Sequence, residues 1–335
     1  MRRVLLILGI SLASFFLLGE VGVRLFSTPR PTMLVPSQHP RLVYELHPAY
    51  PGVNRWGRRD SALDPTTLHT RYKIAVIGDS HAYSIAVSDV HETFPAQIEH
   101  TFQHQLGQSN VTVLNFGVPG YNMAQALAVL QTKVLDYAPQ LIVLQYCIND
   151  THVCNYLQPE HQRFHRLLYR SQFLVFVWQQ LLYGPLGKKY LFDWVGAHFP
   201  DALLFQEGLV GTRKAAPDEE PARRRHPPRT PARVPARYHY MLGEENWRQH
   251  VQQFAQTAHQ HGIPLLATGF ITDVERQVFL QAGFAVYAFA DMFQGQDMRQ
   301  YGYNPDDTAT HFDAQGCRVI GQALAAYITA HYHIR

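Results

Sequence analysis

Five short apolar runs, rich in Val, Ile, Leu and Ala, recur along the chain, at residues 73–77, 111–116, 141–146, 263–268 and 284–287. Between the first three runs, residues 90–107 and 121–136 carry apolar side chains at helical spacing. Continuous apolar runs of this length are typical of strands buried on both faces. Strands that alternate with helices form βαβ units, so the sequence predicts an α/β domain built on a parallel sheet.

The first run stops at Gly78-Asp79-Ser80, which places a serine hydroxyl directly after a buried strand. Open α/β sheets bind their ligands at the carboxyl ends of their strands. A helix that begins near His81 would also place Ser80 beside unpaired backbone N–H groups. An isolated Gly-Asp-Ser is commonly a turn or a helix cap, and Asp79 is expected to tie this turn through its side chain. The blocks that follow downstream favour a nucleophile.

Three later blocks carry residues that can assist a serine. The second run leads into the turn Val118-Pro119-Gly120, and the third ends in Asn149-Asp150. Near the C-terminus, His311 precedes a last amphipathic helix, which Asp313 is predicted to cap. A histidine can take the proton of a serine hydroxyl, and backbone N–H groups and an amide can stabilise an oxyanion.

Ser80, Gly120, Asn149 and His311 together resemble the four residues for which the SGNH, or GDSL-type, hydrolases are named. The resemblance covers roughly residues 54–330 and implies a three-layer α/β/α sandwich with a mainly parallel, five-stranded, flavodoxin-like sheet. It also implies a serine esterase in which Ser80 forms an acyl-enzyme and His311 is its base. The N–H groups of Ser80 and Gly120 and the side-chain amide of Asn149 would form the oxyanion hole.

Two positions depart from the family pattern. Cys147 stands where the family usually has a glycine two residues before the Asn, and Thr308 stands where it usually has an Asp three residues before the His. The acid that orients His311 is therefore either Asp307 or Asp306. Asp307 is predicted, because it lies closer to the family's spacing and a carboxylate there would stabilise the imidazolium.

The N-terminus indicates export. Arg2 and Arg3 precede an apolar stretch over residues 4–26, a pattern shared by signal peptides and membrane anchors. No small-x-small cleavage motif follows, which favours an uncleaved anchor. The positive-inside rule then leaves the N-terminus in the cytoplasm and the catalytic domain in the periplasm or outside the cell. The segment 54–60, Asn-Arg-Trp-Gly-Arg-Arg-Asp, also resembles the approach segment of membrane-anchored bacterial members of the family.

Composition argues against several other classes of protein. A net charge of +3 is too small to indicate nucleic acid binding. Three cysteines do not make a disulfide scaffold, although Cys147 and Cys154 are close enough in sequence for one bridge, and Cys317 in the last helix is expected to be buried. The 19 histidines show no spacing typical of a zinc site, so neither a metal nor a cofactor is predicted.

The predicted organisation has an anchor or signal segment at 1–27, a Pro-rich extended lead-in at 28–60 and a hydrolase domain at 61–335. Two segments interrupt the hydrolase domain. Residues 151–212 are rich in aromatic side chains, which indicates packed helices, a cap over the site or a surface that touches the bilayer. Residues 213–238 carry six prolines and an arginine cluster, a composition typical of a disordered loop that catalysis does not need.

The predicted function is therefore a membrane-anchored serine esterase that acts on acyl or acetyl esters of a carbohydrate or lipid. Its partners would be an acylated small molecule or polysaccharide and the membrane. The fold by itself does not name the substrate. Two alternatives stay open. The same site could transfer the acyl group to a polysaccharide, or the domain could be a catalytically degenerate binding or assembly subunit, which the displaced acid and Cys147 would suit.

Overall fold

The computed structural model describes residues 2–26, 33–61, 65–154, 171–174, 176–177, 236–304 and 310–334. The chain forms two compact units. Unit 1 combines Met1–Pro36 with Tyr156–Gly211, and unit 2 combines Ser37–Asn155 with Thr212–Arg335. Most of the predicted aromatic segment and residues 213–235 of the predicted loop lie outside the described residues, while Ala236–Met241 form a 3-10 helix.

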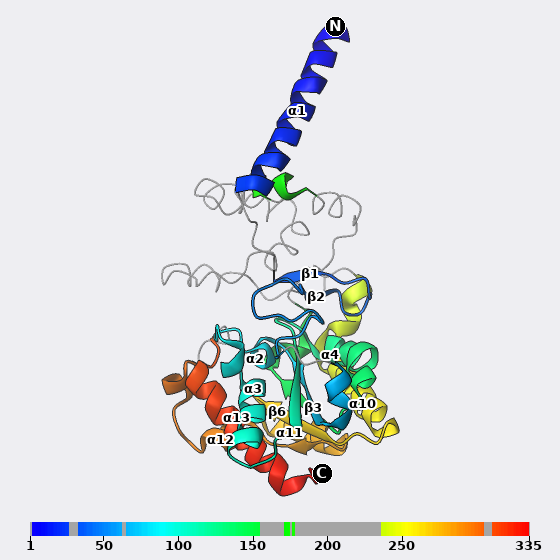
Figure 1. Cartoon of the computed structure of the whole chain (residues 1–335). Helices are drawn as coiled ribbons and strands as arrows, with labels where there is room; N and C mark the ends of the chain where they lie inside the picture. The colour runs from blue at the N-terminus through cyan, green and yellow to red at the C-terminus, as the bar shows by residue number, and fades with distance from the viewer. Residues whose placement is uncertain are drawn as a thin grey trace. The chain divides into compact units, whose positions relative to one another are not determined.

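Unit 2 is built on a five-stranded parallel sheet in the order β4-β3-β5-β6-β7 (Figure 1). The strands are β3 (Tyr72–Gly78), β4 (Val111–Gly117), β5 (Leu141–Tyr146), β6 (Leu265–Gly269) and β7 (Ala285–Val286). This confirms the parallel sheet that the apolar runs predict. The chain adds β4 on one side of β3 and the remaining strands on the other. The direction in which strands are added to the sheet therefore reverses at β3. Sheets of this order bind ligands at this reversal, beside the carboxyl end of β3.

Helices cover both faces of the sheet (Figure 1). On one face α3 (Phe94–His104) packs against α13 (Ala314–His331), and their apolar side chains share a buried cluster with alternate residues of β3 such as Ile74 and Val76. On the other face α4 (Met123–Val129) packs against α10 (Gly243–Gln260). Since the strands are buried on both faces, a three-layer α/β/α sandwich results, as expected.

Several predicted helices differ in detail from those observed. The pattern over 90–107 splits into a 3-10 turn, Val90–Glu92, and α3, because Thr93 caps α3 by accepting from Ala96 N. The pattern over 121–136 continues past α4 as a π-helical turn, Leu130–Val134, and a 3-10 turn, Leu135–Tyr137.

Two helices were not predicted, namely α11 (Asp273–Gln281) and α12 (Phe289–Phe293). A local signal for α11 was present, since Thr272 and Glu275 form a capping box at its start.

Most of the predicted lead-in belongs to unit 2. The short strand β1 (Leu34–Pro36) belongs to unit 1 and β2 (Tyr44–Leu46) to unit 2. Val43, directly before β2, adopts a positive φ of 66°. Further along, Arg58 and Arg59 are almost completely buried. Residues 37–61 therefore fold against the sheet that carries the site.

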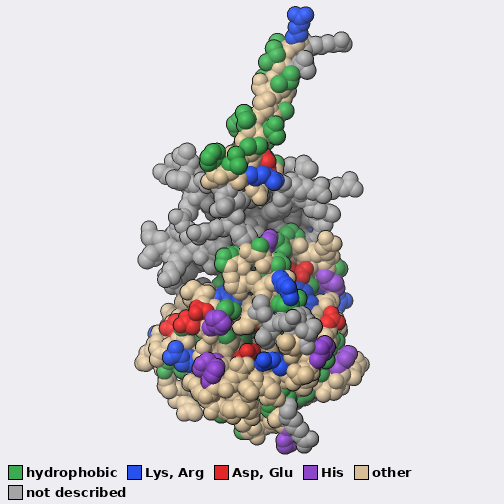
Figure 2. All heavy atoms as spheres, viewed as in Figure 1, with side chains coloured by type: hydrophobic (Ala, Val, Ile, Leu, Met, Phe, Trp, Pro, Cys, Tyr) green, Lys and Arg blue, Asp and Glu red, His purple; other side chains and the backbone are tan. Residues whose placement is uncertain are grey.

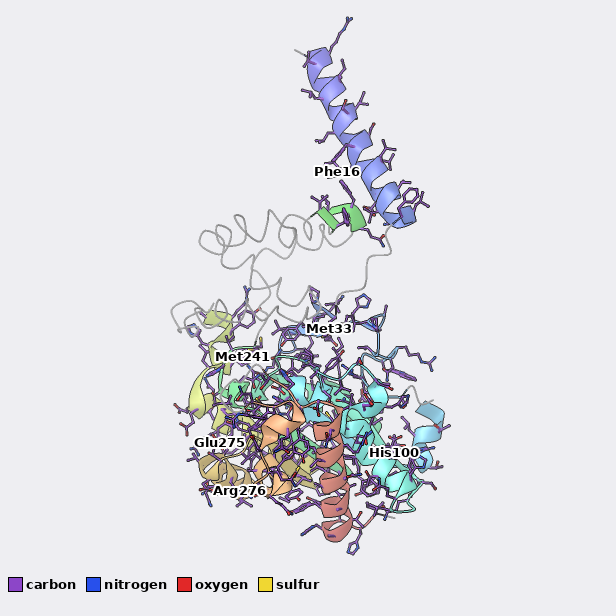
Figure 3. All side chains as sticks on the ribbon, turned by 90° about the vertical axis from the view of Figure 1, so that its left-hand side faces the viewer. Phe16, Met33, His100, Met241, Glu275 and Arg276 are labelled. Carbon is purple, nitrogen blue, oxygen red and sulfur yellow. The ribbon has the colours of Figure 1, made fainter. Side chains whose placement is uncertain are left out.

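Unit 1 contains α1 (Arg2–Phe26), within which Ile7–Phe26 is long and apolar enough to cross a membrane, a test that a signal sequence also passes. Figure 2 shows hydrophobic side chains along this helix. Phe16, labelled in Figure 3, lies edge-on to Phe173 with ring centroids 5.8 Å apart. Glu20 accepts a hydrogen bond from Ser171 Oγ at 2.7 Å. Residues 171–173 of the aromatic segment thus pack against the apolar helix.

Candidate active site

The turn after β3 presents Ser80 as the first residue of α2 (Ser80–Tyr83). As predicted, Asp79 ties this turn: it is the N-cap of α2, and its carboxylate accepts from His81 N at 2.8 Å. A residue at the start of a helix has no intrahelical acceptor for its N–H. Among the described residues, no hydrogen bond uses the N–H of Ser80, so this donor is available to a ligand.

A buried glutamine from the neighbouring strand holds the turn in place. Gln145 Oε1 accepts from the N–H groups of Asp79 and Ala82, both at 3.1 Å. A Cβ on Gly78 would lie 2.5 Å from the same oxygen, so a glycine is required for this close approach. The side chain of Gln145 thereby sets the backbone on both sides of Ser80.

His311 meets Ser80 across 231 residues of sequence, with its Nε2 2.7 Å from Ser80 Oγ. Its segment is fixed on both sides. Asn304 N donates to Thr310 Oγ1 at 2.7 Å, and Asp313 N donates to Tyr301 O at 2.9 Å. Asp313 caps α13 as predicted, accepting from Gly316 N at 2.9 Å.

The two candidate acids lie outside the described residues, which omit 305–309. The choice of Asp307 over Asp306 as the acid that orients His311 therefore stays a prediction.

Gly120 lies in a tight turn beside the nucleophile. Tyr121 N donates to Val118 O at 3.1 Å, and Gly120 has a φ of 76° at the third position, after Pro119. These features match a type II β-turn, in which that position requires a positive φ. Val118 N donates to Gly78 O at 3.1 Å, which joins this turn to the one that carries Ser80. No hydrogen bond among the described residues uses the Gly120 N–H.

Asn149 follows β5 in a short 3-10 turn, Ile148–Thr151, and its side chain lies close enough to the carboxylate of Asp79 to influence the pKa of that group. Burial raises the pKa of Asp79, and hydrogen bonds from His81 N, Asn149 and the Cys147 thiol, together with the charge of His311, oppose the rise. The Oδ1 atom of Asn149 is buried and has no hydrogen-bond partner among the described residues.

A second carboxyl group lies in the same buried region. Burial raises the pKa of Asp150 well above its usual range, and the charge of Asp79 raises it further.

The three cysteines are free and buried, so Cys147 and Cys154 form no bridge, and Cys317 is buried in α13 as predicted. The Cys147 thiol instead lies close enough to Asp79 to oppose the rise in the pKa of that group.

The model of the GDSL-like lipase/acylhydrolase family matches residues 76–319. This chain belongs to that family. It is therefore an enzyme that hydrolyses ester bonds. A search of curated proteins found no match.

Solved structures with a similar fold include three hydrolases. The lipase/acylhydrolase from Enterococcus faecalis is 12% identical with a TM-score of 0.43, and the alignment covers 79% of this chain and 98% of that one. An acetylxylan esterase from Geobacillus stearothermophilus is 10% identical with a TM-score of 0.42, covering 79% and 96%. A two-domain esterase active on acetylated mannans is 8% identical with a TM-score of 0.42, covering 79% and 51%.

This GDSL-like hydrolase carries His81 after its serine, where the family name has a leucine. His81 is 4% exposed, and its ring stacks on His311 with centroids 4.5 Å apart and an interplanar angle of 30°. Phe270 lies edge-on to it at 4.9 Å. Burial lowers the pKa of His81 to about 3, so its ring is neutral beside His311 at physiological pH.

The structure brings together three of the four predicted blocks by direct bonds. Ser80 contacts His311, and Val118 N in the Gly120 turn donates to Gly78 O in the serine turn. The roles of Gln145 and His81 were not predicted from the sequence. A polar residue inside an otherwise apolar strand was the available signal for Gln145, because a buried amide requires partners.

Proposed function

We propose that this hydrolase is a serine esterase that works through an acyl-enzyme on Ser80, with His311 as general base and acid. The contact of 2.7 Å between His311 Nε2 and Ser80 Oγ carries the proposal. It places the proton acceptor within hydrogen-bond reach of a nucleophile that is weak without one. Since Nε2 faces the serine, Nδ1 is left for the acid, for which we propose Asp307.

The reaction would proceed in two balanced steps. Ser80 Oγ attacks the ester carbonyl while its proton passes to His311, and the tetrahedral adduct then expels the alcohol, which takes that proton. Water repeats the sequence to release the carboxylic acid and free Ser80. The oxyanion of each adduct would accept hydrogen bonds from the N–H groups of Ser80 and Gly120 and from Asn149. Loss of one such donor typically lowers kcat about 10²–10³-fold.

The substrate class and location belong to the same proposal. We propose that residues 4–26 anchor the enzyme in a membrane and that the catalytic unit faces the periplasm or the cell exterior. The apolar length of α1 and the arginines that precede it support this orientation. An enzyme placed there would act on acyl or acetyl esters of a carbohydrate or lipid.

The test compares the full-length enzyme in detergent with Ser80→Ala and with Ser109→Ala, which changes an exposed serine. We expect Ser80→Ala to lower p-nitrophenyl acetate hydrolysis by more than about 10⁴-fold, because the nucleophile is lost. Ser109→Ala should match wild type. Mass spectrometry of the quenched wild-type reaction should show one acetyl group on the peptide that contains Ser80. Full activity of a folded Ser80→Ala enzyme would refute the proposal.

Two further outcomes separate the alternatives. Acetylated sugar formed in place of acetate, when an oligosaccharide acceptor is added, would identify a transferase. Absence of turnover by the intact Ser80–His311 pair, with every ester tried, would favour a binding or assembly subunit.

A further inference from the structure

The peptide bond between Pro119 and Gly120 is held by a residue far away in the sequence. Tyr44 OH donates to Pro119 O at 3.0 Å, across 75 residues. Tyr44 is 1% exposed and lies in the lead-in, before the residues 76–319 that match the family. Pro119 O and the Gly120 N–H belong to the same peptide unit, so a bond to the oxygen constrains the direction of the N–H.

The geometry of that unit defines the constraint. The structure contains no cis peptide bond among the residues it describes, and in a trans peptide the C=O and the N–H point in opposite directions. The Gly120 N–H therefore points away from the Tyr44 hydroxyl. Type I and type II turns differ mainly by a flip of this central peptide. A donor fixed on Pro119 O resists the flip, which would turn the N–H away from its present direction.

The lead-in is itself clamped onto the turn. Gln125 Nε2 donates to Leu42 O at 2.7 Å, and Tyr121 OH donates to Tyr44 O. The rings of Tyr44 and Tyr121 lie edge-on with centroids 5.1 Å apart. These bonds fix the backbone on both sides of Val43, whose positive φ is strained for a β-branched residue. The Tyr44 hydroxyl is thus presented on a rigid backbone.

We propose that Tyr44 is a positioning residue for the oxyanion hole: its hydroxyl holds the Pro119–Gly120 peptide so that the Gly120 N–H can stabilise the oxyanion. The role rests on the proposed serine mechanism. Accepting a hydrogen bond on Pro119 O also polarises the peptide and strengthens its N–H as a donor. The lead-in, which follows the N-terminal apolar helix in the sequence, would then contribute to the chemical step without touching the substrate.

The decisive variant is Tyr44→Phe in the full-length enzyme, which removes the hydroxyl and keeps the ring. We expect kcat for p-nitrophenyl acetate to fall about tenfold with KM unchanged, because the interaction acts only where the oxyanion forms. A trifluoromethyl ketone, which forms a charged tetrahedral adduct on a serine, should bind about tenfold more weakly. A packing defect alone would not lower kcat and the affinity for the trifluoromethyl ketone by the same factor.

Tyr332→Phe is the matched control. Tyr332 OH donates to Leu265 O at 3.4 Å, at the start of β6, so the same group is lost at the other end of the sheet. Its kcat should stay within twofold of wild type. Tyr121→Phe is the second variant, and it removes only the bond to Tyr44 O; we expect kcat to fall two- to threefold. If Tyr44→Phe does not fold, the kcat of Tyr121→Phe decides whether Tyr44 positions the oxyanion hole.

The outcomes are distinguishable from failure of the serine mechanism. Activity retained by Ser80→Ala would overturn both the mechanism and the role of Tyr44. Activity lost in Ser80→Ala but unchanged in Tyr44→Phe, or lost equally in Tyr44→Phe and Tyr332→Phe, would overturn the role of Tyr44 alone. A loss confined to KM would also overturn it.

Discussion

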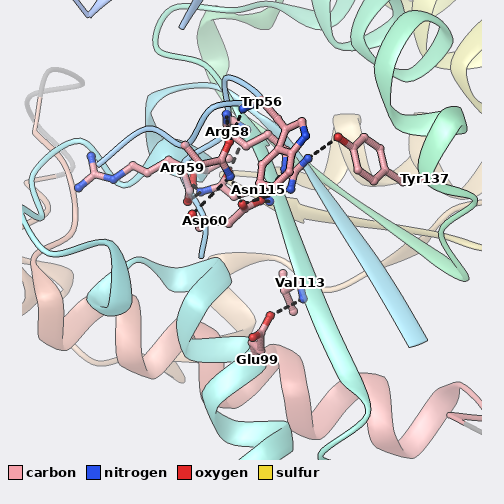
Figure 4. Close-up of polar contacts among 11 residues, drawn as sticks. Trp56, Arg58, Arg59, Asp60, Glu99, Val113, Asn115 and Tyr137 are labelled. Atoms are coloured by element: carbon pink, nitrogen blue, oxygen red, sulfur yellow. Dashed lines mark hydrogen bonds and ion pairs between the residues drawn. The ribbon is translucent and has the colours of Figure 1, made fainter. Parts of the chain in front are cut away.

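Two buried carboxylates, Asp60 beside β4 and Asp79 after β3, have opposite surroundings. Asp60 pairs with Arg58 at 2.8 Å and accepts from Asn115 N at 2.9 Å (Figure 4). The Arg58 guanidinium also donates to Tyr137 OH. Asp79 forms no ion pair with Lys or Arg among the described residues, and its carboxylate accepts a hydrogen bond from His81 N.

The Asp60 cluster completes the edge of the sheet. β4 is an edge strand, and its outward N–H groups at Asn115 and Val113 donate to the carboxylates of Asp60 and Glu99 (Figure 4). Unpaired edges invite pairing with other chains, and these side chains occupy the edge. Burial raises the pKa of Asp60, which the Arg58 charge opposes. This cluster serves stability.

The Asp79 region keeps ionisable groups buried without a Lys or Arg partner among the described residues, which is typical of functional sites. His81, Asp79 and Asp150 all have pKa values shifted toward their neutral forms by burial. The two regions thus differ in how they treat buried charge. In the lead-in, Arg58 balances the charge of Asp60, which favours folding. The buried ionisable groups of the serine turn, near His311, have no Lys or Arg partner among the described residues. Three variants test this contrast.

The largest effect is expected for Asp60→Asn. The neutral amide leaves the Arg58 guanidinium buried without its counter-charge, which costs about 3–5 kcal/mol of unfolding free energy. Urea unfolding followed by tryptophan fluorescence measures the loss. The kcat of the folded enzyme should be unchanged. Asp291→Asn is the control, because it breaks the partly exposed pair with Arg276, which Figure 3 labels, and should cost less than about 1 kcal/mol. Equal losses would contradict a structural role for the Asp60 pair.

His81→Leu should change how stability depends on pH. With a folded pKa of about 3 and an unfolded value of 6.5, only the unfolded chain protonates His81 between these values. Wild type therefore loses stability, relative to the variant, by about 1.4 kcal/mol for each pH unit below 6.5.

The measurement is the difference in unfolding free energy between His81→Leu and wild type at several pH values from 7.5 to 4. The carboxyl groups that both proteins share make the unfolding free energy depend on pH in the opposite direction, and taking the difference cancels their contribution. A difference that does not vary with pH would show that His81 is not held neutral by burial.

The smallest effect is expected for Asp79→Asn. The new amide oxygen can still accept from His81 N, so stability should change by less than about 1 kcal/mol. The charge of Asp79, however, which interacts with that of His311, is lost. We expect kcat to fall about tenfold, or ~1.4 kcal/mol of barrier. A large loss of stability with unchanged kcat would show that Asp79, like Asp60, serves folding and not catalysis.

Much of the fold was predictable because its signals are local. Apolar runs predicted all five strands of the parallel sheet, and β3, β4 and β5 begin and end within one residue of the prediction. The helix α11 was overlooked although Thr272 and Glu275 marked its start. Ser80 was predicted from its place after a strand end and His311 from the resemblance to the four family blocks, and the structure places the two residues in contact.

The sequence by itself determined the parallel sheet, the glycine at position 120 and the order of the four blocks, because each depends on neighbouring residues. Only the tertiary structure decided which side chains hold those blocks: Gln145 on the serine turn, Tyr44 on Pro119, and Asp60 on Asn115. Each bond joins segments more than 50 residues apart. No local pattern specifies it, because its partners meet only when strands and loops distant in the sequence pack together and bury polar groups that must then be satisfied.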